Sequence, residues 1–246
     1  MPAELEARAA ERLARERATY DAKLEARADK AQHTGKKPRG KPPAPPRTGV
    51  RVDDQINLTD PDSRIMPVAG GGFEQCCNAQ AAVDVDTMLV VATGLTQAAN
   101  DRQQFTPLIT ALPEPLGEVT RLLADTGYCS AANVGACVNV GIEPMLAAGR
   151  EAHYLSWHAR FSQPPPLPLP TDPVTRMKHP LHTRAGRAWY ALRKQTVEPV
   201  FGIIKSVMGL RQCLLRGLNA VSGEWSLVTM AWNIRRKATL QTLASG

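Results

Sequence analysis

The pattern of hydrophobic and polar positions first changes near residue 33. Residues 3–32 are rich in Ala, Glu, Arg and Leu and contain neither Gly nor Pro, which predicts a helix. Its leucines are too sparse for a sustained heptad, and opposite charges recur three and four positions apart. We therefore expect a solvated helix rather than a coiled coil. Residues 33–56 begin with a Pro-, Gly- and Lys-rich run that predicts a flexible linker.

From residue 57 onward, short apolar runs alternate with helical patterns. Residues 80–85 and 88–93 are predicted to be two strands of a hairpin, followed by an amphipathic stretch over 102–112. A further strand is predicted over 118–124, and it ends at Asp125. Strands followed by helices in this order predict an α/β fold with a mixed sheet.

The remaining part of the chain is predicted to contain helices, one further strand and an irregular insertion. Ser130 is a suitable N-cap for a short helix over 131–140, and a short strand is predicted over 141–147. Residues 150–182 are interpreted as an irregular insertion that contains a proline run. Two further helices are expected at the C-terminal end, over residues 183–208 and 218–237.

Charge separates the two ends of the chain. The whole chain carries +7, whereas residues 175–246 hold 12 Lys and Arg against 2 Asp and Glu. A surface of this kind favours nucleic acid as the partner. No apolar run is long enough to cross a membrane. The five cysteines lack paired spacing, which indicates free thiols in a reducing, cytoplasmic compartment.

Two carboxylates stand where chemistry is expected. Asp125 lies at the end of a predicted strand, before a Gly turn, which is where α/β sheets bind ligands. A turn-initiating Asp is the alternative interpretation. Glu198 shares a predicted helix face with Lys194 and Lys205, and an ordinary Lys194–Glu198 ion pair is its alternative. Pro199 predicts that the helix is either kinked at Glu198 or begins there.

The two carboxylates are chemically suited to a divalent metal. Asp125 and Glu198 offer the oxygen ligands that Mg²⁺ or Mn²⁺ binds. Such a metal activates the attacking oxygen and stabilises the leaving oxygen of a phosphodiester, although a two-metal site usually needs a third acid. Lys194 and Lys205 are expected to contact phosphates. The basic run at 235–237 is expected to do the same from a helix C-terminus.

The same residues carry a resemblance to a known family. The run ADTGYCS at 124–130, followed by Y, RK and VEPVFGIIK within 190–205, resembles the DDE transposases of bacterial insertion sequences. The resemblance covers residues 57–237. Its further matches are NLTDPDSRIM at 57–66, NAQAAVD at 78–84, Asn100-Asp101, Arg216-Gly217 and Glu224-Trp225.

The resemblance implies a fold, a reaction and a set of site residues. It implies a ribonuclease-H-like mixed sheet flanked by helices over 57–240, with irregular insertion 150–182. The reaction is cleavage and joining of double-stranded DNA, at transposon ends and target, with Mg²⁺ or Mn²⁺. The family's second and third catalytic acids map to Asp125 and Glu198. The expected DNA contacts are Tyr190, Arg193, Lys194, Lys205, Arg211, Arg216, Arg235 and Arg236.

The sequence also departs from the family pattern. Cys76 and Cys77 stand where such proteins often have Gly-Tyr, and Arg193 lies one residue further from Glu198 than usual. The family's first acid lies on a first core strand ahead of a helical insertion. Residues 1–32 resemble part of that insertion, and nothing before residue 57 is predicted to be a strand ending in Asp. We therefore expect an N-terminally incomplete copy that lacks the first core strand and is weakly active or inactive.

Two other functions are left open by the sequence. One is a non-catalytic DNA-binding or regulatory remnant, which forms a homodimer or pairs with full-length transposase. The other is a ribonuclease-H-like nuclease that never rejoins strands. Each of these proteins is expected in the cytoplasm, associated with the nucleoid.

Overall fold

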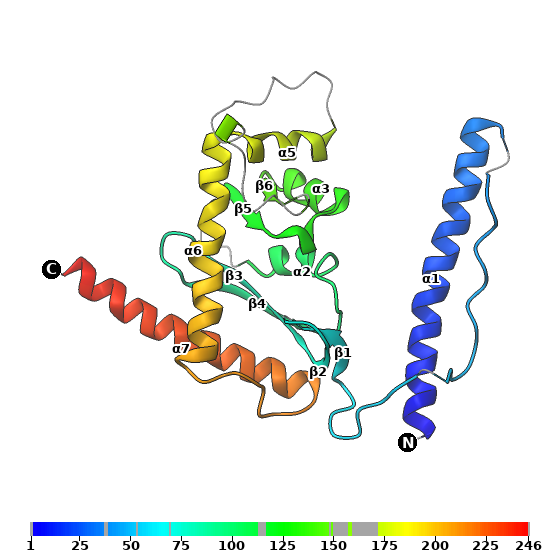
Figure 1. Ribbon diagram of the computed structural model, residues 1–246, viewed down its shortest axis with the longest axis horizontal. Helices are drawn as coiled ribbons and strands as arrows, with labels where there is room; N and C mark the ends of the chain where they lie inside the picture. Colours follow the sequence, from blue (N-terminus) through cyan, green and yellow to red (C-terminus); the bar gives the residue numbers. More distant parts are fainter. Residues whose placement is uncertain are drawn as a thin grey trace. The chain divides into compact units, whose positions relative to one another are not determined.

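The computed structural model describes residues 2–36, 39–52, 54–68, 70–112, 117–147, 149, 157–158 and 172–245 (Figure 1). The chain divides into two compact units, Met1–Pro61 and Asp62–Gly246. Among the described helices, none is long and apolar enough to cross a membrane.

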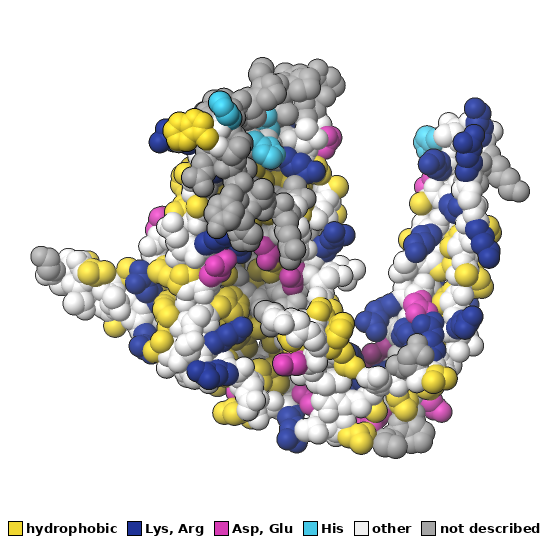
Figure 2. Space-filling model, in the orientation of Figure 1, with side chains coloured by type: hydrophobic (Ala, Val, Ile, Leu, Met, Phe, Trp, Pro, Cys, Tyr) yellow, Lys and Arg dark blue, Asp and Glu magenta, His cyan; other side chains and the backbone are white. Residues whose placement is uncertain are grey.

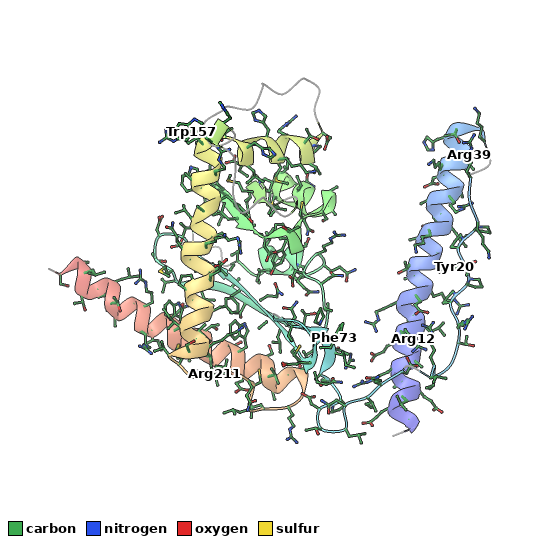
Figure 3. All side chains as sticks on the ribbon, in the orientation of Figure 1. Arg12, Tyr20, Arg39, Phe73, Trp157 and Arg211 are labelled. Atoms are coloured by element: carbon green, nitrogen blue, oxygen red, sulfur yellow. The ribbon has the colours of Figure 1, made fainter. Side chains whose placement is uncertain are left out.

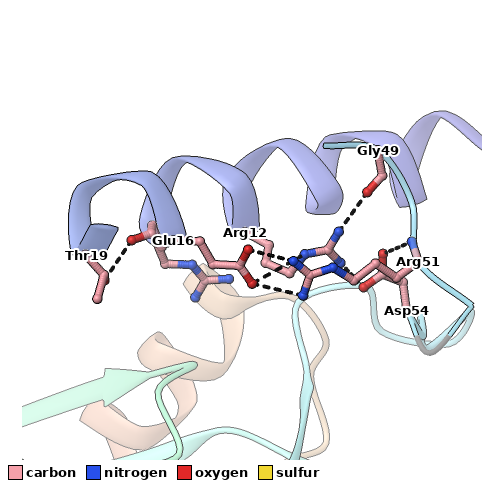
Figure 4. Close-up of polar contacts among 7 residues, drawn as sticks. Arg12, Glu16, Thr19, Gly49, Arg51 and Asp54 are labelled. Atoms are coloured by element: carbon pink, nitrogen blue, oxygen red, sulfur yellow. Dashed lines mark hydrogen bonds and ion pairs between the residues drawn. The ribbon is translucent and has the colours of Figure 1, made fainter. Parts of the chain in front are cut away.

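The first unit is a helix with a strap folded back along it. Helix α1 (Pro2–Thr34) is followed by a segment that runs back beside it (Figure 1). Arg12 forms an ion pair with Asp54 and donates to the carbonyl of Gly49 at 2.8 Å (Figure 4). Arg51 binds both carboxylate oxygens of Glu16, at 3.0 and 2.7 Å. The Pro-rich segment is thus tied to the helix by charged side chains.

The second unit begins with a hairpin that the sequence pattern does not predict. Strands β1 (Arg64–Pro67) and β2 (Phe73–Cys76) pair antiparallel, with Ile65 opposite Gln75. The three glycines at 70–72 all have positive φ, between 90° and 98°, which suits them for the turn. The glycine cluster was the visible signal, but four-residue strands are too short for a reliable alternation.

The predicted hairpin over 80–93 is confirmed, with its strands slightly displaced. Strands β3 (Asn78–Val83) and β4 (Val90–Thr96) pair antiparallel. In the turn, one oxygen of Asp84 accepts from the backbone N–H of Thr87 at 2.9 Å. Met88 has φ of 60°, in the left-handed region.

The strand that ends at Asp125 is also confirmed. Strand β5 pairs in parallel with β6, and helix α3 connects them. The N-terminus of α3 is capped as predicted, because Ser130 Oγ accepts from the N–H of Asn133 at 3.1 Å. Their bounds are β5 (Arg121–Ala124), the 3₁₀ turn η2 (Thr126–Tyr128), α3 (Ala131–Asn139) and β6 (Glu143–Leu146).

The mixed α/β organisation is confirmed, but the strand pairing differs from a single mixed sheet. In the part of the chain that the structure describes, the strands form three two-stranded sheets: β1–β2, β3–β4 and β5–β6. Helix α2 (Phe105–Thr110), shorter than its predicted amphipathic stretch, follows β4. The core around β5 and β6 contains Phe105, Val134, Cys137, Met145 and Leu146.

The prediction that residues 150–182 are irregular is wrong for residues 173–182, because these form helix α5 (Pro173–His182). Asp172 caps it by accepting from the N–H groups of residues 174 and 175, both at 3.0 Å. Pro173 occupies the first turn, where proline is tolerated. The proline run at 164–170 lies outside the described residues. A Cβ at Gly186 would clash with the carbonyl of Pro180, so glycine permits the close approach of α5 and α6.

Two long helices complete the unit. Helix α6 (Arg184–Ser206) confirms the helix predicted over 183–208. Helix α7 (Leu218–Ala244) runs past the predicted end at 237 and lies against the β3–β4 hairpin (Figure 1). The core between them is built from Val90, Val200, Ile204, Trp225 and Trp232.

Candidate active site and nucleic-acid interface

Asp125 occupies the turn that follows β5. Its Oδ1 accepts from the N–H of Gly127 at 2.9 Å, and its backbone carbonyl accepts from the N–H of Tyr128 at 3.3 Å. The side chain is partly exposed. Asp125 therefore does cap a turn, as the alternative interpretation stated, and it does so at the end of a strand.

Asp101 is a second acid beside this turn, and the sequence analysis did not select it as a site residue. A Cβ built on Gly127 would lie 2.9 Å from Asp101 Oδ2 and 3.1 Å from Asp125 Oδ1. Both carboxylates therefore approach one point of the backbone, which only glycine leaves open. The available signal was the Asn100-Asp101 match within the family resemblance.

Asp101 is held by two side-chain amides of β3. Its Oδ1 accepts from Asn78 Nδ2 at 2.7 Å and from Gln80 Nε2 at 2.9 Å. Gln80 is 5% exposed, and its Oε1 accepts from the hydroxyl of Tyr128. These contacts join the β3–β4 hairpin to the Asp125 turn.

Tyr128 is kept protonated by its surroundings. Burial raises the pKa of its phenol, and the nearby charges of Asp101 and Asp125 raise that pKa further. A protonated phenol donates to Gln80. On the other side of the turn, Asn133 Nδ2 donates to the carbonyl of Tyr128 at 2.7 Å. The turn that carries Asp125 is thereby fixed from both sides.

Glu198 lies on α6 with 54% of its side chain exposed. Its ion-pair partner is Arg193, at 3.2 Å, rather than the Lys194 that helical spacing favoured. Pro199 lies inside α6, so the prediction that a helix begins at Pro199 is wrong. Lys194 is exposed beside the pair.

A chain of contacts connects Glu198 to the Asp125 turn. Arg193 Cζ lies 5.8 Å from the ring centroid of Tyr190, in a cation–π arrangement. The Tyr190 hydroxyl donates to the carbonyl of Ala124 at 3.3 Å, one residue before Asp125. These contacts link α6, which carries Glu198, to the end of β5, which precedes Asp125.

The donor chemistry of this region suits a divalent ion, but the number of donors is incomplete. Carboxylate oxygens are the ligands that Mg²⁺ and Mn²⁺ prefer. Within the described ranges, no group of three or more His, Cys, Asp or Glu side chains could hold a metal ion. One oxygen of Asp125 is already bound to Gly127, and one oxygen of Glu198 to Arg193.

The predicted DNA contacts fall into three groups. Arg236 is half-buried, and its Nε donates to the carbonyl of Thr87 at 2.7 Å, so it fastens α7 to the β3–β4 turn. Arg193 pairs with Glu198, and Tyr190 bonds to the carbonyl of Ala124, as described above. Figure 2 shows dark blue cationic side chains over the surface of α6 and α7. The exposed cations among the predicted contacts are Lys194, Lys205, Arg211, Arg216 and Arg235.

Fold and site together define an α/β protein with paired carboxylates beside a strand end and a basic surface on two long helices. The chain belongs to the transposase DDE domain family, whose model matches residues 53–234. This match confirms the resemblance drawn from the motifs at 124–130 and 190–205. No curated protein and no solved structure matches the chain. The family implies transposition-related chemistry on DNA, generally with a divalent metal.

Proposed function

We propose that this chain carries the strand-cleaving and strand-joining chemistry of a transposase at insertion-sequence ends. The observation that carries the proposal is the link through Tyr190 and Arg193 between the strand that ends before Asp125 and the helix that bears Glu198, within a DDE domain. The proposed site works on double-stranded DNA in the cytoplasm, beside the nucleoid.

In this proposal Asp125 and Glu198 would hold Mg²⁺ or Mn²⁺, which would activate the attacking water or 3′-hydroxyl and stabilise the leaving oxygen. The Arg193 guanidinium, paired with Glu198 in this structure, would be available to bind phosphate if Glu198 turned to the ion. The exposed cations Lys194 and Lys205 lie on the same helix and would orient the DNA backbone.

A ribonuclease-H-like arrangement is the fold that we propose for this domain. It is supported by the element order: the β3–β4 hairpin, then β5 ending at Asp125, then a long helix bearing Glu198. The parallel pairing of β5 with β6 through α3 is the crossover that such a sheet uses.

Cleavage of duplex DNA containing the element's ends, with Mn²⁺, tests the catalytic proposal. Asp125→Asn and Glu198→Gln should abolish cleavage, because each removes a metal ligand while keeping the shape of the side chain. Glu143→Gln is the matched control: Glu143 is an exposed acid of β6, paired with Arg121. Equal cleavage by all four proteins would contradict the assignment of the two acids.

A second candidate is a non-catalytic DNA-binding protein that forms a homodimer or pairs with a full-length transposase. It is favoured by the ion pair that occupies Glu198 and by the lack of a three-ligand group among the described residues. Salt-dependent DNA binding without cleavage is its expected outcome. A joining assay with pre-cut ends distinguishes the transposase from a nuclease that never rejoins strands.

A further inference from the structure

Two consecutive leucines protrude from the loop that joins α6 to α7. We call residues 211–216 the leucine loop; Figure 3 labels Arg211 at its beginning. Leu214 is 79% exposed and Leu215 is 51% exposed. Burying a large apolar side chain lowers its free energy relative to leaving it in water. Two adjacent exposed leucines on one loop therefore indicate a surface that binds a partner.

The leucine loop is held in shape by carboxylates. Both oxygens of Glu224 accept from the N–H of Leu214, at 2.9 and 3.0 Å, and one also accepts from the N–H of Leu215 at 3.0 Å. Immediately after the loop, Asp62 Oδ2 accepts from the N–H of Leu218 at 2.9 Å. A loop that is ordered before binding loses less conformational entropy when it binds.

The charge around the leucines identifies the class of partner. Arg211 and Arg216 flank the pair, and both are exposed; Lys205 is exposed on the last turn of α6. Residues 207–217 contain no Asp or Glu, and the carboxylates that contact the loop point at its backbone N–H groups. Pairing this loop with itself across a two-fold axis would bring like charges together, which disfavours a second copy as partner.

We propose that Leu214 and Leu215 form an apolar wedge that enters double-stranded DNA between adjacent base pairs. Arg211 and Arg216 then bind the phosphates on the two sides of the opened step. Unstacking a step costs free energy, which burial of the leucines and the phosphate contacts offset. The wedge rests on the DNA-binding part of the proposed function and needs no catalysis.

The test uses the full chain and duplex DNA of mixed sequence with 2-aminopurine at one flexible TA step. The fluorescence of 2-aminopurine rises when the base is unstacked, so wild-type protein should raise it. The double variant Leu214→Ala/Leu215→Ala should bind DNA with an unchanged salt dependence but leave the fluorescence at its starting value. Leu227→Ala is the matched control, because Leu227 is 62% exposed on α7 and lies outside the leucine loop.

Two further variants separate the parts of the wedge. Arg211→Ala/Arg216→Ala should lower the slope of log affinity against log salt by about 2, since each arginine neutralises one phosphate. Glu224→Gln keeps both leucines and loosens the loop, so it should reduce the fluorescence gain without abolishing binding.

Four outcomes would overturn the wedge. If wild-type protein binds DNA without a fluorescence change, the proposed wedge is wrong and the proposed DNA-binding function is unaffected. A fluorescence gain that survives the double leucine variant assigns the unstacking to other residues. A change of molecular mass in light scattering, confined to the leucine variant, shows that the leucines contact protein instead. Failure of wild-type protein to bind DNA at all would contradict the proposed DNA-binding function as well as the wedge. It differs from the first outcome, in which the protein still binds DNA.

Discussion

The Tyr190 hydroxyl donates a hydrogen bond to the carbonyl of Ala124, 3.3 Å away, and so fastens α6 to the end of β5. The acceptor lies one residue before Asp125, and the donor's ring lies under Arg193, which pairs with Glu198. One aromatic side chain thus relates the two elements that carry the predicted catalytic acids.

Replacing Tyr190 with Phe should loosen the end of β5. The ring remains and the donor is lost, so the carbonyl of Ala124 loses a hydrogen bond worth about 0.5–1.5 kcal/mol. Hydrogen exchange read by mass spectrometry should speed up in peptides covering residues 121–128. Tyr20→Phe, in the other compact unit, is the control and should leave those peptides unchanged. Unchanged exchange in Tyr190→Phe would show that the hydroxyl does not stabilise this junction.

Replacing Gln80 with Leu should destabilise the second unit more strongly than Tyr190→Phe does. Gln80 is buried, and its loss leaves Asp101 and Tyr128 short of one partner each. An unsatisfied buried group costs about 1–3 kcal/mol, so a fall of this order or greater is expected in the free energy of unfolding. Urea unfolding followed by Trp fluorescence measures it. Gln103→Leu, at an exposed position, should stay within about 0.5 kcal/mol of wild type.

Asn233 of α7 acts as an edge partner for β4. Its Nδ2 donates to the carbonyl of Val90 at 2.7 Å, and its Oδ1 accepts from the N–H of Val90 at 2.8 Å. Asn233→Ala removes both bonds, and a loss of about 1–3 kcal/mol in unfolding free energy is expected. Asn219→Ala, exposed in the first turn of the same helix, is the matched control. Similar losses in the two variants would mean that helix propensity, not the edge contact, sets the effect.

The cysteines should differ in reactivity and in their effect on the pH dependence of stability. Cys137 is buried, and burial raises the pKa of its thiol to about 11, from an ordinary value of 9.0. Cys213 is exposed. At pH 8 a thiol reagent should modify Cys213 rapidly and Cys137 only after unfolding, because the thiolate is the reactive form.

The sign of the pH effect follows from the neutral form being the one that is buried. The pKa of Cys137 is higher in the folded state, so its stabilising contribution is complete below pH 9 and is lost as pH rises towards about 11. Urea midpoints measured across this range should fall less steeply in Cys137→Ala than in wild type. Cys213→Ala should follow the wild-type curve; a parallel fall in Cys137→Ala would exclude the thiol as the cause.

Much of the secondary structure could be predicted because its signals are local. The alternation over 80–93, the Ser130 cap and the long amphipathic pattern of α6 each depend on neighbouring residues. Helix α5 was missed although its signal, Asp172 followed by Pro173, is equally local; the proline-rich surroundings outweighed it. The motif residues also indicated the family, which the match over 53–234 confirms.

The sequence by itself thus determined the long helices α1, α6 and α7, the β3–β4 hairpin, the strand ending at Asp125 and the family. Only the tertiary structure decided that Asp101 lies beside Asp125, that Gln80 joins Asp101 to Tyr128, and that two leucines remain exposed. These relationships join residues that are far apart in the chain, or depend on what covers a side chain. Both are fixed by packing and by the pairing of buried polar groups, which no local pattern of residues records.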